Sequence, residues 1–157
     1  MQIKAGDLAI GDNFTMTSGD CINPLCRNIY ACIYITNGGK IKIGNNVGMS
    51  SPCLWVTNSL IIGDRVRIGG NCTIIDSDVH DIDFMARANL RPHDIKNAPI
   101  VLENDVWLGT NVTILKGVTI GARSIIGAGS VVTKSIPADC IAAGNPCKII
   151  KRIISNE

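Results

Sequence analysis

The sequence predicts an all-β fold in which the chain winds into a parallel β-helix, and three observations lead to this prediction. Aliphatic residues recur every six residues between Leu102 and Pro137, a period that fits neither an α-helix nor a pleated strand. Small or branched residues form a second set four positions later. Only 4% of the chain is aromatic while 46% is hydrophobic, so the core must consist of Ile, Val and Leu, of which Ile and Val favour strands.

The period of six means that the chain returns to the same environment after each short strand and turn, with about 18 residues in a coil of three strands. The aliphatic set should point into a narrow prism, and the second set should fill its corners. Gly109, Gly121 and Gly127, each directly after an aliphatic residue, are expected to supply positive φ. The aliphatic set is Leu102, Leu108, Ile114, Ile120, Ile126 and Val132, and the corner set is Val106, Val112, Val118, Ser124, Ser130 and Ile136.

The whole chain, 1–157, is predicted to be one domain with interruptions in the repeat. Ile62 lies thirteen residues after Met49, which predicts a one-residue bulge that contains Trp55. The polar stretch after Val79 contains both histidines, and long excursions from a rigid repeat often carry function. A terminal coil needs a cover, because an open β-helix end is an unpaired edge. The predicted parts are an N-terminal coil and extruded loop (1–34), first coils (35–79), an extruded loop (80–98), last regular coils (99–137) and a C-terminal cap (138–157).

The seven cysteines are an odd number, and the N-terminus lacks the hydrophobic region of a signal peptide, which favours reduced thiols in a cytoplasmic protein. Cys53 and Cys72 fall at corner positions of their hexads, where a small buried residue fits. Cys21 and Cys26 have no further close ligands, so no metal site is expected. The net charge of +2 does not favour nucleic acid, and no apolar run is long enough to insert into a membrane.

His80 is the candidate for acid–base chemistry, because it follows the last regular strand before the loop and its backbone is held by the coil. His93 lies deeper in the loop. A nearby carboxylate could orient the imidazole ring, and the spacing leaves four of them open: Asp76, Asp78, Asp81 and Asp83. The alternative is that His80 is an ordinary surface histidine.

Several motifs together resemble one family. These are D-x-D-x-H at Asp76–Asp78–His80, Arg87 after it, VWLG, GAGSVVTK and GNPCK. Over residues 35–153 the chain is similar to the hexapeptide-repeat O-acetyltransferases, a left-handed β-helix group that includes galactoside, maltose and capsular polysaccharide acetyltransferases. The resemblance implies a left-handed coil and a homotrimer with active sites between subunits. It also implies acetyl-CoA as co-substrate, no metal, and direct acetyl transfer to a hydroxyl of a sugar or polysaccharide precursor.

The same resemblance assigns roles to individual residues. His80 matches the catalytic base that takes the proton of the acceptor hydroxyl. The positions that match coenzyme-binding residues are Thr110, Ala128, Thr133, Lys134, Lys148 and Lys151, and those expected to bind the acceptor are Ser50, Asp78, Arg87 and Trp107. Two further readings stay open: a trimeric scaffold without activity, and an acetyltransferase for antibiotics. A γ-class carbonic anhydrase is set aside, because that class binds zinc through three histidines and this chain has two.

Overall fold

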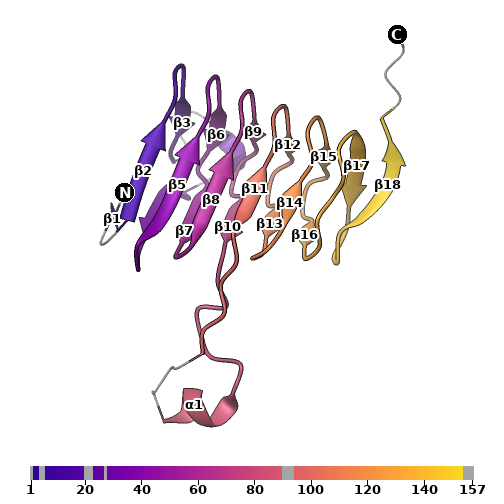
Figure 1. The fold of residues 1–157 in the computed structure, drawn as a ribbon. Helices are drawn as coiled ribbons and strands as arrows, with labels where there is room; N and C mark the ends of the chain where they lie inside the picture. Colours follow the sequence, from indigo (N-terminus) through magenta and orange to yellow (C-terminus); the bar gives the residue numbers. More distant parts are fainter. Residues whose placement is uncertain (1, 4–5, 20–22, 27, 90–93, 154–157) are drawn as a thin grey trace.

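The computed structural model describes residues 2–3, 6–19, 23–26, 28–89 and 94–153, and it has the predicted left-handed parallel β-helix. Three sheets form the sides of a triangular prism, and each coil adds one strand to each side (Figure 1). We call the turns between them the A–B, B–C and C–A corners. Sheet A has six strands: β1 (Gln2–Ile3), β4 (Cys32–Ile35), β7 (Cys53–Val56), β10 (Thr73–Ile75), β13 (Thr113–Ile114) and β16 (Val131–Val132).

Sheets B and C complete the prism. The five strands of sheet B are β2 (Gly6–Ile10), β5 (Gly39–Ile43), β8 (Ser59–Ile62), β11 (Ile100–Leu102) and β14 (Thr119–Ile120). The seven strands of sheet C are β3 (Thr15–Thr17), β6 (Gly48–Ser50), β9 (Arg67–Ile68), β12 (Trp107–Leu108), β15 (Ile125–Ile126), β17 (Cys140–Ala143) and β18 (Lys148–Arg152). All neighbouring strands are parallel except β17 and β18.

The interior of the prism is the predicted one. Both sets of hexad residues between Leu102 and Ile136 are buried, and the most exposed of them, Ile136, is only 5% exposed. Stacked residues of one sheet lie in register, as Ile74, Ile114 and Val132 do in sheet A. The coils therefore bury one continuous aliphatic column, and stability is close to a sum over neighbouring coils.

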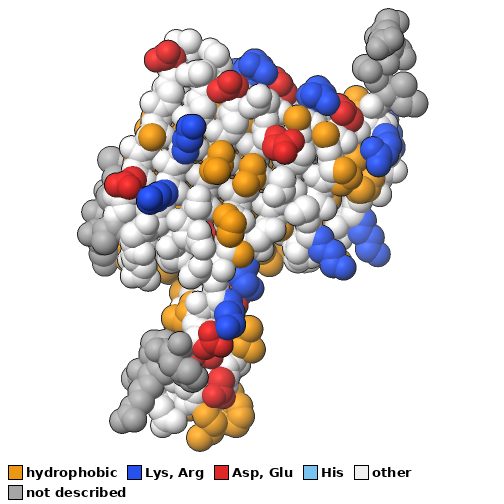
Figure 2. All heavy atoms as spheres, viewed as in Figure 1, with side chains coloured by type: hydrophobic (Ala, Val, Ile, Leu, Met, Phe, Trp, Pro, Cys, Tyr) orange, Lys and Arg blue, Asp and Glu red, His pale blue; other side chains and the backbone are white. Residues whose placement is uncertain are grey.

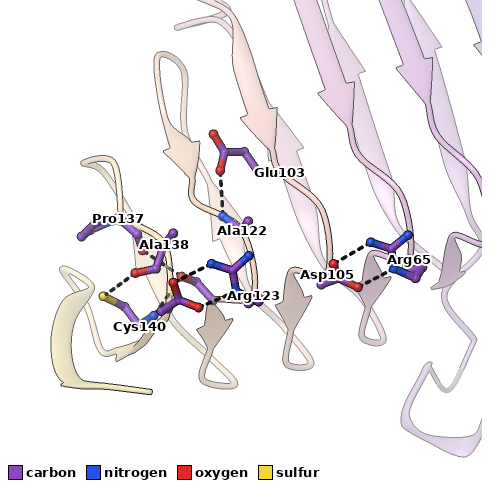
Figure 3. A network of polar contacts seen from close by, with 10 residues as sticks. Arg65, Glu103, Asp105, Ala122, Arg123, Pro137, Ala138 and Cys140 are labelled. Carbon is purple, nitrogen blue, oxygen red and sulfur yellow. Dashed lines mark hydrogen bonds and ion pairs between the residues drawn. The ribbon is translucent and has the colours of Figure 1, made fainter. Parts of the chain in front are cut away.

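Left-handed residues stack along the B–C corner, and none of those that the structure describes there is a glycine. Arg65, Asp105, Arg123 and Asp139 have φ values of 59°, 63°, 61° and 59°. Their side chains pair between coils: Arg65 Nε donates to Asp105 at 2.7 Å and Arg123 Nε donates to Asp139 at 2.6 Å (Figure 3). Each guanidinium hydrogen bond lowers the pKa of its aspartate partner. The paired side chains give these strained positions interactions between coils.

The prediction that the glycines after the aliphatic residues supply positive φ is wrong. Gly109, Gly121 and Gly127 are not among the residues with positive φ. They are required because the next coil approaches closely: a Cβ on Gly121 would lie 2.2 Å from the backbone nitrogen of Ala138. The glycines thus allow contact between backbones of successive coils.

The first coils differ from the prediction around β7. Cys53 is in register with Cys32 and is only partly buried, while Leu54 and Val56 point inward, so Cys53 is not a corner residue. Trp55 lies in register with Tyr34 and Ile75, so it is not in a bulge. The turns between the strands accommodate the irregular spacing. In the turn before β7, Ser51 has a φ of 43°.

The corner position of Cys72 leads to a prediction about alkaline pH. Burial raises the pKa of its thiol from 9.0 to about 11, whereas the thiol of the unfolded chain titrates at the lower value. Stability is therefore full below pH 9 and is lost as the pH rises to about 11, by about 3 kcal/mol. Urea unfolding of the wild type and of Cys72→Ala at pH 8 and pH 11 should show this extra loss only in the wild type. An equal loss in both proteins would contradict the assignment.

Two segments leave the coils. Residues 17–30 are expected to form an extruded loop, and within them the 3₁₀ turn Pro24–Cys26 lies against the C–A corner: a Cβ on Gly70 would be 3.0 Å from the Sγ of Cys26. Cys21 lies outside the described residues. The second segment follows β10, projects away from the prism and contains α1 (Phe84–Ala88) (Figure 1).

The described residues also bear on metals and membranes. In the ranges that the structure describes, no three His, Cys, Asp or Glu side chains gather closely enough to hold a metal ion. No helix in the same ranges is long and apolar enough to cross a membrane.

Candidate active site at two corners of the prism

His80 stands on a strained turn at the A–B corner. Its backbone N–H donates to the carbonyl of Asp78 at 2.6 Å, which closes a γ-turn around Val79. Val79 has a φ of 63°, which is strained for a β-branched residue. Strain of this kind persists where the surroundings hold it, and the imidazole is left exposed to solvent.

The neck of the projecting loop supplies that support. Asp78 N–H donates to the carbonyl of Lys96, and Ala98 N–H donates to the carbonyl of Asp76, both at 2.9 Å. An isolated bridge between Ser77 and Asn97 lies between these bonds. His80 therefore lies next to the hydrogen-bonded neck of the loop and not in the middle of the loop.

Asp78 is fixed by a lysine that the sequence analysis did not single out. Lys116 Nζ lies 2.5 Å from Asp78 Oδ1, and both side chains are partly exposed. The other carboxylate oxygen of Asp78 is buried without a hydrogen-bond partner among the described residues. Since Lys116 follows β13, the contact could not be inferred from spacing across the irregular loop. Asp78 shares the corner of His80, but its described side-chain partner is Lys116.

The other three candidate acids bind backbone amides, Asp76 those of the preceding coil and Asp81 and Asp83 those of the loop. Asp76 is fully buried and accepts the amides of Thr57 and Asn58 at 2.8 and 2.7 Å. Asp83 accepts from Met85 N at 2.9 Å and caps α1. Asp81 accepts the backbone amides of Asp83 and Asp94 at 3.0 and 2.9 Å. Each of these carboxylates is thus engaged with backbone amides.

Thr133 and Lys134 lie at the same A–B corner as His80. Both are exposed and follow β16. Because Val132 is in register with Ile114, Lys134 stands one coil beyond Lys116. The corner therefore presents lysines from two successive coils close to the base of the loop.

A shallow apolar groove of about 400 Å³ lies at the C–A corner. Trp107, Thr110 and Ala128 line it together with Leu25 of the N-terminal segment. Trp107 is 52% exposed, and the glycines of the corner let the floor consist largely of backbone. The sequence analysis found the first three residues but missed Leu25, because the period of six says nothing about a segment outside the repeat.

Lys148 and Lys151 extend this face of sheet C. Lys148 pairs with Ala143 and Lys151 pairs with Ile141 across the antiparallel β17–β18 ladder. Directly paired residues share one side of a sheet. Ile141 is in turn in register with Ile125 of the groove. The two lysines thus lie on the outer face that carries the groove, towards its C-terminal end.

Other expected acceptor residues are placed elsewhere. Arg87 lies on α1 and donates to the carbonyls of Asp81 and Ile82, both at 2.7 Å, so it braces the loop. Ser50 ends β6, two strands before β12 in sheet C. His93 lies outside the described residues. Within one chain, then, His80 is at the A–B corner, whereas the groove with Thr110 and Ala128 is at the C–A corner.

Residues 99–134 match the family described as "Bacterial transferase hexapeptide (six repeats)", and residues 59–77 match "Hexapeptide repeat of succinyl-transferase". A crystal structure of a hexapeptide-repeat-containing acetyltransferase from Vibrio cholerae superposes with a TM-score of 0.74 at 30% identity, over 94% of this chain and 74% of that one. The chain belongs to the hexapeptide-repeat acetyltransferases. This hexapeptide-repeat protein is also 39% identical to the galactoside O-acetyltransferase of Escherichia coli over 77% of its own length, but spans only 58% of that relative.

Two structures of related hexapeptide-repeat acetyltransferases contain the coenzyme. The Vibrio cholerae protein has been solved with acetyl coenzyme A, with a TM-score of 0.70 and 28% identity over 91% of this chain and 72% of that chain. A galactoside acetyltransferase has been solved with coenzyme A, with a TM-score of 0.70 and 33% identity over 90% of this chain and 66% of that chain. Two relatives of this chain have thus been solved with the coenzyme bound.

Proposed function

We propose that this hexapeptide-repeat protein transfers the acetyl group of acetyl-CoA to a hydroxyl of a saccharide, directly, with His80 as the general base. The observation that carries the proposal is the exposed His80 held on a strained turn in a chain that also has an apolar groove flanked by lysines. The imidazole takes the proton of the acceptor hydroxyl while its oxygen attacks the thioester carbonyl. The carbon–sulfur bond breaks, and the leaving thiolate takes up a proton to give free coenzyme A.

The coenzyme is proposed to lie along the outer face of sheet C. The backbone floor beside Ala128 and Thr110 suits the thin pantetheine arm, and Trp107 offers it an apolar wall. Lys148 and Lys151 supply positive charge for the phosphates. Thr133 and Lys134 stand at the A–B corner with His80 and are assigned to the coenzyme that is bound in the groove of the adjacent subunit. Acceptor contacts are proposed for Ser50, Asp78 and Arg87.

The active site is proposed to lie between subunits of a homotrimer. His80 and the groove occupy different corners of one prism, so a single chain does not bring them together. In a closed ring of identical subunits, the A–B corner of one subunit can face the C–A corner of the next. The loop tip fits this arrangement, because the exposed apolar side chains of Ile82, Phe84 and Met85 gather there (Figure 2) and gain from burial against a neighbour.

The test of the proposed function is the release of free thiol from acetyl-CoA with a panel of monosaccharides, oligosaccharides, amino acids and chloramphenicol. Release that depends on a saccharide supports the proposal. Release with chloramphenicol alone would support an antibiotic acetyltransferase instead. No release, together with no binding of acetyl-CoA by calorimetry, would support a scaffold.

The lysines of β18 give a separate prediction for the coenzyme. Replacing Lys148 and Lys151 together by Gln should raise the KM for acetyl-CoA about tenfold with kcat unchanged, because phosphate contacts bind ground state and transition state alike. The KM should also become less sensitive to salt. The matched control is the pair Lys40→Gln and Lys42→Gln on β5, which removes two exposed lysines from sheet B. Equal effects of the two pairs would refute a specific phosphate site.

A further inference from the structure

Two thiols lie side by side on the outer face of sheet A. Cys32 begins β4 and Cys53 begins β7, and the two residues are in register across this parallel pair of strands. Their side chains point outward, because the next residues of the strands, Ile33 and Leu54, are buried in the prism. Among the cysteines that the structure describes, Cys32 and Cys53 are the two that are not buried. Reagents in solution can therefore reach this pair, which the proposed function does not use.

The backbone holds the two cysteines at the spacing of the sheet. Cys32 N–H donates to the carbonyl of Pro52 at 2.7 Å, and Cys53 N–H donates to the carbonyl of Cys72 at 2.8 Å, so the ladder includes the first residue of both strands. Neighbouring strands lie about 4.8 Å apart. This spacing falls within the range of about 4.4–6.8 Å that separates the Cα atoms of a disulfide. A bond between the two sulfurs therefore needs only a small movement of the strands.

The side chains of this face also interact across the ladder. Burial raises the pKa of the Cys53 thiol, and the charge of Cys32 and a side-chain hydrogen bond with Cys32 raise it further. Two residues further along the same strands, the rings of Tyr34 and Trp55 meet with centroids 5.3 Å apart. Outward side chains of β4 and β7 thus reach their partners at two successive outward positions.

We propose that Cys32 and Cys53 form a reversible disulfide when the protein meets a peroxide. One thiolate attacks an oxygen of hydrogen peroxide, the O–O bond breaks, and a sulfenic acid and hydroxide are formed. The other thiolate attacks the sulfenic sulfur, and the S–O bond breaks to release a second hydroxide. The protons of the two thiols convert both hydroxides to water, so two thiols are oxidised and one peroxide is reduced. Parallel side chains must lean together to make this bond, and the resulting strain leaves it open to reduction by thiols.

The disulfide would close one full coil of the prism. Between Cys32 and Cys53 the chain passes through β5 and β6 and returns to sheet A. Stability in such a fold is close to a sum over neighbouring coils, so a bond between two coils near the N-terminal end opposes their separation. The segment that supplies Leu25 to the groove at the C–A corner returns to the prism at Cys32. Oxidation would therefore also fix the point where this segment ends, whether or not the protein transfers acetyl groups.

Peptide mapping tests the bond itself. The wild type is treated with hydrogen peroxide, its remaining thiols are blocked with N-ethylmaleimide, and it is digested with trypsin without a reductant. Cleavage after Lys and Arg places Cys32 in residues 28–40 and Cys53 in residues 43–65, and neither peptide has another cysteine. Mass spectrometry should find these two peptides linked, with two hydrogen atoms fewer than their sum. Dithiothreitol should separate them.

Thermal unfolding tests the closing of the coil. A bond around a loop of about 20 residues restricts the unfolded chain, so peroxide should raise the melting temperature by about 5 °C, and dithiothreitol should reverse the rise. Cys32→Ser changes an exposed side chain and should keep the melting temperature of the untreated wild type. After peroxide, this variant should show neither the linked peptides nor the rise. Cys21→Ser is the matched control, and it should show both.

Three results would overturn the proposal. Sulfinic acid on Cys32 without linked peptides would show that the two sulfurs do not reach each other. Linkage confined to a species of twice the chain mass on a non-reducing gel would place the bond between subunits. Linked peptides without a rise in melting temperature would reject the closed coil. None of these measurements uses acetyl-CoA, so their outcome is independent of the proposed function.

Discussion

Replacing His80 by alanine should reduce acetyl transfer by a factor of about 10² to 10⁴, the usual contribution of a positioned general base. Acetyl-CoA should bind the variant as it binds the wild type, because the residues that line the groove, such as Thr110 and Ala128, are unchanged. The exposed imidazole contributes little to folding, so the melting temperature should be unchanged. Thiol release at saturating acetyl-CoA and acceptor measures the effect.

The conservative variant His80→Gln should be as inactive as His80→Ala, since an amide can form hydrogen bonds but does not accept the proton at neutral pH. Transfer at the wild-type rate in either variant would remove His80 from the mechanism. Lost transfer with an equally lost affinity for acetyl-CoA would indicate a binding role instead.

The second prediction concerns mixtures of inactive subunits. His80→Ala lacks the base, and Ala128→Trp fills the groove, whose wall at this position is exposed. If each site takes its base from one subunit and its groove from the next, a trimer that contains both variants has one intact site. Random assembly of an equal mixture should therefore recover about a quarter of the wild-type activity.

The mixture is prepared by unfolding and refolding the two variants together, or by coexpression with different affinity tags. Each variant refolded with itself is the control and should stay inactive. Isolated mixed trimers with no activity would contradict the intersubunit site, because a site built within one chain carries a defect in every subunit.

The interior of the fold could be predicted because every coil requires an aliphatic residue at the same position. Ile114 and Val132 stack on Ile74, and the aliphatic residues of this kind recur every six residues in the sequence. The role of the glycines could not be predicted in the same way. Residues with side chains, such as Arg123 and Asp105, take the left-handed φ at the B–C corner, while Gly121 is needed for a neighbour that is distant in sequence.

The candidate site was predictable where it follows the repeat. Thr110 and Ala128 follow strands of sheet C in successive coils, so the repeat already places them at one corner. A pocket of about 180 Å³ at the A–B corner was not predictable, because the residues that line it, among them Tyr34, Trp55 and Ser77, come from three coils that are separated by irregular spacing. The wrong prediction for Cys53 has the same origin. The turn before β7 is shorter than the turn of a regular hexad, so the other set of alternate residues in the following strand points inward.

The closed neck of the projecting loop has a consequence for how such proteins diversify. Bonds among Asp76, Asp78, Lys96 and Ala98 join the two ends of the loop, and β10 and β11 continue their own ladders on either side. The length of chain between these ends enters the folding free energy only weakly, as a logarithm. Insertions, deletions or whole exchanged segments can therefore be accepted here without disturbing the stacked coils. Partner preference can then evolve at this point while the stacked coils stay the same.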